Sequence, residues 1–225
     1  MLRLRGVEHR FAGRSDTAPP ALDIPELSVE AGQLTVIRGP SGSGKTTLLY
    51  VLSGLIKPSA GQVQWDAVDI ATLGEGARDQ WRRRTAGFVF QNFNLIEEMS
   101  PLGNVTLAAY FAAFTDAAVR ERGKALLAQF GVADEARKVS SYSRGEQQRV
   151  ALARALVFDP PILFADEPTA SLDEGNSAGL CQSFKRLAAE GRTVVAVSHD
   201  PLLIEAADSV VMLGHGRVVE RELVA

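Results

Sequence analysis

The residues Gly39-Pro40-Ser41-Gly42-Ser43-Gly44-Lys45-Thr46 have the types and the spacing that bind a chain of phosphates. They fit the pattern G-x-x-x-x-G-K-[ST] at every fixed position. The glycines let several backbone N–H groups turn toward the phosphates, an approach that side chains would block. Lys45 supplies a mobile positive charge for the terminal phosphates, and the Thr46 hydroxyl can ligate Mg²⁺.

The segments on either side of this loop have the patterns that the site requires. Residues 33–38 alternate like a strand, and residues 47–52 predict a helix that ends near Gly54. A helix that opens at Gly44 directs its positive end at the phosphates. A glycine-rich turn could match the pattern by chance, but the strand–loop–helix context favours a nucleotide site.

A second group with chemical potential follows the apolar segment Ile162–Ala165, where Asp166 and Glu167 stand side by side. Open α/β sheets bind their ligands at the carboxyl ends of their strands. Asp166 can hold Mg²⁺ directly or through water, and Glu167 is suited to polarise an attacking water. Two adjacent acids could merely cap a strand; in company with Lys45 and Thr46 they favour hydrolysis.

The whole-chain composition limits the possible partners. The chain has 225 residues, 46% of them hydrophobic, and a formal net charge of −3. It is long enough for one domain with a sizeable core, and its charge predicts no nucleic-acid partner. A single cysteine, Cys181, excludes an internal disulfide, fits a reducing compartment and is expected to pack in a helix. The N-terminus lacks the apolar segment of a signal peptide, and no run approaches the roughly 18 to 20 apolar residues that span a bilayer. We therefore expect a chain that is soluble by itself.

The remaining patterns predict an α/β fold. We expect an edge strand at 2–7, a surface loop at 13–21, a small antiparallel hairpin at 61–70, a helix at 79–84 and strands at 87–90, 161–165, 193–197 and 209–213. Helices are expected at 101–114, at 116–130, from about 143, and at 175–189. Strands separated by helices indicate a parallel sheet with helices on both faces.

The block of helices is therefore an insertion into that α/β core. We predict one domain over residues 1–225, with a core at about 1–91 and 158–225, a small antiparallel β subdomain, and a helical subdomain at about 92–157.

Several motifs together resemble the ATP-binding-cassette (ABC) ATPases over the whole chain. Residues 142–149, Tyr-Ser-Arg-Gly-Glu-Gln-Gln-Arg, resemble the signature motif of that family, and residues 171–173 follow the acidic pair as its D-loop does. His199 matches the switch histidine, Gln91 the glutamine of the Q-loop, and Phe11 the aromatic residue that stacks on adenine. Singly these matches are weak, since His199 could be structural and Phe11 plain core, but six elements in the family's order are specific.

The resemblance implies a P-loop NTPase core with ATP and Mg²⁺ as cofactors and a site shared by two cassettes. Ser143 and the Gly145 N–H would reach the γ-phosphate of ATP held by the partner's Lys45, and Asp173 would couple the two halves. His199 would contact the γ-phosphate, and Gln91 would sense the metal and the lytic water. The residues with implied roles are, for catalysis, Glu167, His199, Gln91 and Lys45; for the nucleotide, Phe11, Gly39, Pro40, Ser41, Gly42, Ser43, Gly44, Lys45, Thr46, Thr47, Ser143, Gly145 and Asp173; and for the metal, Thr46, Gln91 and Asp166.

Two residues depart from the family's signature. Arg144 stands where the family usually has glycine, and Tyr142 where it usually has leucine. The Arg144 side chain could point away and change little, or its charge could lie near the triphosphate and alter dimer closure or turnover. The sequence leaves both alternatives open.

Residues 82–96, with Asn104 and Val105, are similar to the bacterial cassettes of lipoprotein release, macrolide export and cell division, although Gly103 stands where that subfamily often has glutamate. This implies a homodimer or a cassette heterodimer on a separate integral-membrane permease, at the cytoplasmic face of the inner membrane. It would drive export or extraction of a lipophilic or lipoprotein-type cargo. A groove for the permease would be lined by Phe93, Leu95, Ile96 and Met99, each of which could instead belong to the subdomain core.

Three other functions remain as alternatives. A mechanical or regulatory cassette on a membrane partner could have the same catalytic residues. A nucleic-acid or ribosome-associated ABC ATPase is disfavoured by the small size, the acidic balance and the single cassette. A small-molecule kinase with a phosphate loop would lack His199 and the motif at 142–149. The cargo, the direction of transport and the permease are determined by another chain.

Overall fold

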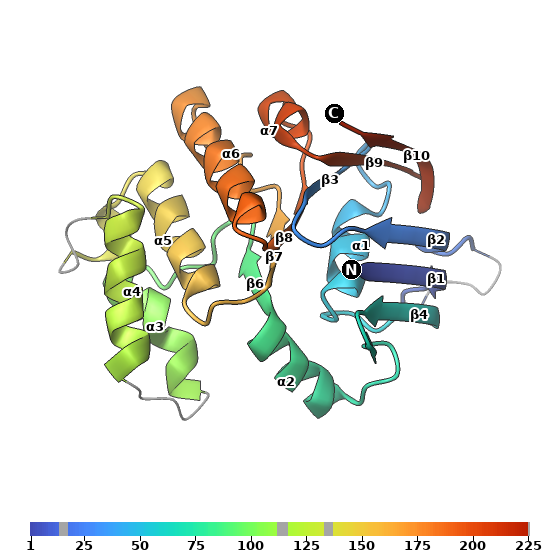
Figure 1. The fold of residues 1–225 in the computed structure, drawn as a ribbon, viewed down its shortest axis with the longest axis horizontal. Helices are drawn as coiled ribbons and strands as arrows, with labels where there is room; N and C mark the ends of the chain where they lie inside the picture. Colours follow the sequence, from blue (N-terminus) through green and yellow to red (C-terminus); the bar gives the residue numbers. More distant parts are fainter. Residues whose placement is uncertain (14–17, 112–116, 133–136, 225) are drawn as a thin grey trace.

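The computed structural model describes residues 1–225 except 14–17, 112–116, 133–136 and 225 (Figure 1). One sheet is small and antiparallel, with the strand order β2-β1-β4-β5. Its strands are β1 (Leu2–His9), β2 (Leu22–Val29), β4 (Ala60–Trp65) and β5 (Val68–Asp69). The antiparallel pairing of β4 with β5 confirms the predicted hairpin.

The prediction that residues 2–7 form an edge strand was wrong. β1 pairs with β2 on one side and with β4 on the other. β2 was not predicted, because Pro25 interrupts its alternation and proline is rare inside sheets. In the structure Pro25 falls opposite Gly6, whose φ of 56° already interrupts the ladder between the pairs Arg5–Glu26 and Val7–Ile24.

The larger sheet has the order β10-β9-β3-β8-β7-β6. Its strands are β3 (Leu34–Arg38), β6 (Ala86–Val89), β7 (Ile162–Asp166), β8 (Thr193–Val197), β9 (Ser209–Gly214) and β10 (Arg217–Leu223). All neighbours are parallel except β10, which runs antiparallel to β9. Every residue of β7 and β8 is buried, as expected for parallel strands covered on both faces. The predicted parallel sheet is confirmed, and β10 was not predicted.

Alternate side chains of the central strands belong to two separate cores. Val195 and Val197 pack with α1 (Lys45–Leu52) and the small sheet. Val194 and Ala196 pack with α5 (Arg144–Leu156) and α6 (Glu174–Ala189). The large sheet therefore separates α1 from α5 and α6 (Figure 1).

The remaining helices are α2 (Glu75–Thr85), α3 (Pro101–Phe111), α4 (Ala117–Gln129), α7 (Pro201–Ala206) and the short 3₁₀ helix η1 (Val139–Ser141). The described parts of α3, α4 and α5 pack on one another. The end of the helix predicted at 101–114 and the start of the one predicted at 116–130 fall on residues 112–116, which lie outside the described residues. Cys181 is buried on α6, where burial raises the pKa of its thiol to about 11. Within the described ranges, no helix has the length and apolar character needed to cross a bilayer.

We expect Gly87→Ala to destabilise the fold, because β6 lies directly against the backbone of α5. A Cβ at Gly87 would lie 2.3 Å from the Ala155 carbonyl oxygen and 3.0 Å from Pro160 Cγ. Overpacking of this kind costs about 1–3 kcal/mol. Urea denaturation measures the loss.

Gly179→Ala on α6 is the matched control, since a Cβ there meets no atom within 4 Å. Alanine is favoured over glycine inside a helix by about 0.8–1.0 kcal/mol, so this variant should be as stable as the wild type or more stable. Equal stability of the Gly87 variant and the wild type would contradict the close packing of β6 on α5.

Candidate functional site

The predicted phosphate loop connects the carboxyl end of β3 to α1, and its shape depends on glycine. Gly39 and Gly44 have φ values of 153° and 98°. A Cβ would lie 2.1 Å from the Leu213 carbonyl oxygen at Gly39 and 2.9 Å from the Ala21 carbonyl oxygen at Gly44. Side chains at these positions would therefore collide with backbone that cannot move away, and the loop keeps its N–H groups accessible.

The loop presents several donors for an anion. The Lys45 ammonium folds back over it and donates to the carbonyl oxygens of Gly39 and Pro40 at 2.9 and 3.1 Å. Gly44 caps α1 without a side chain, so the first N–H groups of this helix face the loop without a capping oxygen. Ser43 Oγ is buried and makes no hydrogen bond with any described residue. A solvent-accessible loop of donors with a mobile lysine fits a polyphosphate.

Thr46 and Asp166 meet beside this loop. The Thr46 hydroxyl donates to Asp166 Oδ1 at 3.1 Å. Asp166 is the last residue of β7 and is buried; burial and the adjacent Glu167 raise the pKa of its carboxyl, while the Thr46 hydrogen bond opposes that rise. Hydroxyl and carboxylate oxygens suit Mg²⁺, which completes its coordination with water and substrate phosphates. The described residues contain no larger cluster of metal ligands.

Tyr50 lies one turn along α1 from Thr46 and was not predicted as a site residue. Burial, followed by the charge of the Asp166 carboxylate, raises the pKa of the Tyr50 hydroxyl. Only the three-dimensional proximity of α1 and β7 could reveal this neighbour.

Glu167 and His199 come together at the carboxyl ends of β7 and β8. His199 Nδ1 lies 3.0 Å from Glu167 Oε2, although the pair does not form an aligned hydrogen bond. Glu167 has the left-handed φ of 44°, and its N–H donates to the Val197 carbonyl oxygen at 2.9 Å. Strained backbone of this kind is frequent where a side chain has a functional orientation. The carboxylate is mostly buried while the imidazole is exposed.

Gln91 and Phe11 lie on the exposed surface. Gln91 lies in a turn two residues beyond the end of β6, the strand next to β7, and its side chain hydrogen-bonds to no described residue. Phe11 follows β1, is 42% exposed, and contacts the edge of His9 with ring centroids 4.8 Å apart. This exposure excludes the alternative that Phe11 belongs to the core.

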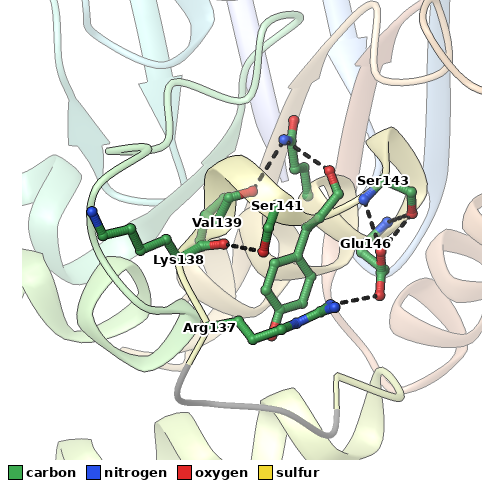
Figure 2. Close-up of polar contacts among 8 residues, drawn as sticks. Arg137, Lys138, Val139, Ser141, Ser143 and Glu146 are labelled. Carbon is green, nitrogen blue, oxygen red and sulfur yellow. Dashed lines mark hydrogen bonds and ion pairs between the residues drawn. The ribbon is translucent and has the colours of Figure 1, made fainter.

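The start of α5 is held by a reciprocal set of hydrogen bonds (Figure 2). Ser143 Oγ accepts from the Glu146 N–H, and Glu146 Oε2 accepts from the Ser143 N–H at 2.8 Å and from the Ser143 hydroxyl at 2.7 Å. The Ser143 hydrogen bonds lower the pKa of the Glu146 carboxyl. Arg137 lies 3.5 Å from that carboxylate. The exposed Ser143 is thus fixed at a helix N-terminus.

Two neighbours of Ser143 are buried. Tyr142 packs beneath the Arg137 guanidinium, which lies 4.4 Å from its ring centroid. A Cβ at Gly145 would lie 2.3 Å from Asn176 Oδ1 on α6, so only glycine fits without displacing Asn176. Asn176 also accepts from Arg149 at 3.1 Å and was not identified from the sequence.

Asp173 caps α6 within the same chain. Its carboxylate accepts from the Asn176 N–H and from the Asn176 side-chain amide, both at 2.8 Å. No hydrogen bond or ion pair in the described part of the chain joins residues 143–145 to the phosphate loop. The structure thus brings Lys45, Thr46 and Asp166 together, brings Glu167 and His199 together, and leaves Ser143 and Gly145 elsewhere.

The comparisons with known proteins agree with these motifs. The family profile described as ABC transporter matches residues 22–170. A lipoprotein-releasing system ATP-binding protein from Syntrophotalea carbinolica is 40% identical over 195 residues, which are 86% of this chain and 86% of the relative. The chain belongs to the ABC transporter family, as one of its ATP-binding cassettes.

Other relatives of this ABC cassette are larger or have known structures. A macrolide export ATP-binding/permease protein from Paracoccus denitrificans is 40% identical over 220 residues, 97% of this chain but 33% of that protein. The cassette thus spans about a third of such relatives. The dimeric, post-hydrolysis structure of the ATP-binding cassette MJ0796 with ADP and Pi is 34% identical, with a TM-score of 0.90 over 100% of this chain and 99% of that one.

The family membership decides the chemistry of the site. ABC cassettes bind ATP with Mg²⁺ and hydrolyse it, so this chain is an ABC-type ATPase. The predicted ABC fold is confirmed. The donors of the phosphate loop and the Thr46–Asp166 pair have the composition that Mg·ATP requires. The individual roles assigned to the site residues remain predictions.

We expect Glu146→Gln to weaken the start of α5 in a pH-dependent way. The pKa of Glu146 is lowered in the folded chain, so its carboxylate stabilises the fold above the ordinary pKa, and that stabilisation is lost as the pH falls through the lowered value. Caps of this type contribute about 0.5–2 kcal/mol. Urea denaturation should therefore show a less stable variant at neutral pH and a shrinking difference in acid; a difference independent of pH would contradict the role of the charge.

Proposed function

We propose that this ATPase works as a head-to-tail pair of cassettes on a separate integral-membrane permease, where ATP-driven closure and hydrolysis drive export or extraction of a lipophilic or lipoprotein-type cargo. One observation carries the pairing. The phosphate loop opens α1 on one side of the large sheet, and Ser143 opens α5 on the other. Each chain therefore holds two incomplete halves of a nucleotide site, which a homodimer or a cassette heterodimer would complete.

In the proposed pair the phosphate loop and Lys45 bind the triphosphate, and Thr46 and Asp166 hold Mg²⁺, which neutralises phosphate charge. Phe11 is exposed and available to stack on adenine. Ser143 Oγ and the Gly145 N–H of one copy face the nucleotide of the other. A second helix N-terminus then approaches the same polyanion, which is electrostatically favourable.

Glu167 is proposed as the base. The second oxygen of its carboxylate is buried and without an aligned hydrogen bond among the described residues, so it can accept a proton from an attacking water. The exposed His199 lies against this oxygen and can orient the carboxylate while it reaches the terminal phosphate. Gln91, on the neighbouring strand end, is proposed to contact the metal and the water. Asp173 is proposed to couple the two halves from its capping position.

The division into an ATPase core at about 1–91 and 158–225 and a helical subdomain at about 92–157 is part of the proposal. The mutual packing of α3, α4 and α5 supports it. The four residues predicted to line the permease groove differ in how exposed they are. Phe93 is 1% exposed and belongs to the interior, whereas Ile96 is 44% exposed and is available to a permease segment. Leu95 and Met99 are half-buried.

The cargo and the location rest on the relatives. Macrolide export and lipoprotein release both concern lipophilic molecules or lipid-bearing proteins, and these relatives support a lipophilic cargo. A methionine import ATP-binding protein from Rhizobium meliloti is 39% identical over 220 residues and supports a polar cargo instead. We favour the lipophilic cargo because residues 82–96 are similar to the export and release cassettes. The proposed location is the cytoplasmic face of the inner membrane.

We expect Glu167→Gln to bind ATP, to hydrolyse it at least about 100-fold more slowly, and to form a dimer in its presence, because loss of a general base typically costs about 10²–10⁴-fold in rate. Light scattering measures the dimer and phosphate release measures turnover. Lys45→Ala in the same background is the control that should stay monomeric. Wild-type turnover in the Gln variant would remove Glu167 from the proposed role.

We also expect the chain to co-purify with a multispanning permease from detergent-solubilised membranes of its source. The Ile96→Asp variant should lose this partner while retaining ATP binding, because an exposed apolar contact is replaced by a charge. Reconstitution with the captured permease then compares release of a lipid-anchored peptide with uptake of methionine. Uptake without release would contradict the lipophilic cargo.

A further inference from the structure

Arg144 connects the start of α5 to two loops that lie next to predicted site residues. Its guanidinium lies 4.7 Å from the ring centroid of Phe93, in the turn that follows β6. Arg144 Nη2 donates to Ser171 Oγ at 3.0 Å, in the D-loop after β7, and Nη1 lies 3.3 Å from Gln147 Oε1. Arg144 itself is the first residue of α5, next to Ser143. One side chain therefore contacts both the turn next to Gln91 and the loop next to Asp173.

The turn beneath Arg144 has an unusual backbone. Phe93 and Asn94 have φ values of 59° and 46°, a left-handed conformation that asparagine tolerates but that a bulky residue such as phenylalanine adopts rarely and at a cost. The Arg154 guanidinium donates to the carbonyl oxygens of both residues, at 2.6 Å for Asn94. α5 thus holds this turn at two points, with Arg154 on its backbone and Arg144 on the buried Phe93 ring.

We propose that Arg144 is a positioning residue, which keeps the turn after Gln91 and the D-loop in fixed relation to Ser143. This inference rests on the proposed function, since it assigns a purpose to the link between those loops. Planarity suits arginine to the role, because one face stacks on a ring while the edge donates to a hydroxyl. Motion of Gln91 or Asp173 on nucleotide binding would then be transmitted to Ser143 through one side chain.

The same contacts bear on the two alternatives that the sequence left open for Arg144. The guanidinium of Arg144 donates to Ser171 and Gln147 and stacks on the ring of Phe93. Its positive charge is therefore positioned by contacts within its own chain. Arg144 and Ser171 are both exposed, so the contact contributes little to the free energy of unfolding. Its loss should therefore appear in turnover and hardly in thermal stability.

The test uses the purified full chain and compares Arg144→Gly, Arg144→Lys, Ser171→Ala and the double variant Arg144→Gly/Ser171→Ala. We expect Arg144→Gly to lower kcat for ATP by about fivefold or more, with KM for ATP changed by less than about twofold, and the double variant to be no slower than Arg144→Gly. Arg144→Lys should resemble Arg144→Gly, because an ammonium has neither the stacking face nor the fork. The exposed Arg120→Gly on α4 is the control for loss of a surface arginine, and melting curves confirm that each variant folds.

Other outcomes would overturn the inference in distinguishable ways. Wild-type kcat in Arg144→Gly would show that the link has no function. A raised KM that Arg144→Lys restores, and that high salt abolishes in the wild type, would show a direct contact with the triphosphate. Strictly additive losses in the double variant would show that Arg144 and Ser171 act independently. If the wild-type chain does not turn over ATP, the proposed function fails as well. If it does, a negative result for the variants counts only against the positioning role of Arg144.

Discussion

A triphosphate carries more charge than one lysine can neutralise, so backbone N–H groups must enclose it, and this requirement governs the arrangement around the phosphate loop. The loop can take its shape only because Gly39 fits against the carbonyl of Leu213 and Gly44 against that of Ala21. Leu213 belongs to β9, and Ala21 immediately precedes β2. The larger sheet and the small antiparallel sheet therefore both determine the geometry of the loop. Leu213 and Ala21 themselves are not among the residues predicted to contact the nucleotide.

A comparable constraint acts at the start of α5. Ser143 is exposed at a helix N-terminus, and the helix behind it is firmly packed. The capping box pairs the N–H groups of Ser143 and Glu146, and Gly145 lies so close to Asn176 that a side chain there would push α5 and α6 apart. Asn176 in turn donates to Asp173. Because packed interfaces shift as units, we expect a displacement of the D-loop to move the N-terminus of α5 and Ser143 with it.

The parts of the fold that the sequence predicted are those whose environment leaves a local pattern. β7 and β8 are buried on both faces and appear as continuous apolar runs, and the phosphate loop has a motif with fixed spacing. β2 was missed because Pro25 breaks its alternation, and β10 because its residues are mostly exposed and include Arg217, Glu220 and Glu222. The contacts of Tyr50, Asn176 and Arg144 depend on partners far away in the chain, so no local spacing could reveal them.

The position of Arg144 also explains how a departure from the family's glycine can be accommodated. Phe93 offers the Arg144 side chain a flat apolar ring, and Ser171 offers it an acceptor. The left-handed turn at Phe93 makes that ring available, and Arg154 stabilises the turn from the other end of α5. Substitution of glycine by arginine thus depends on a turn that is itself costly. The contact of Arg144 with Ser171 is exposed and contributes little to the folding free energy, so its presence at a strained turn is better explained by positioning than by stability.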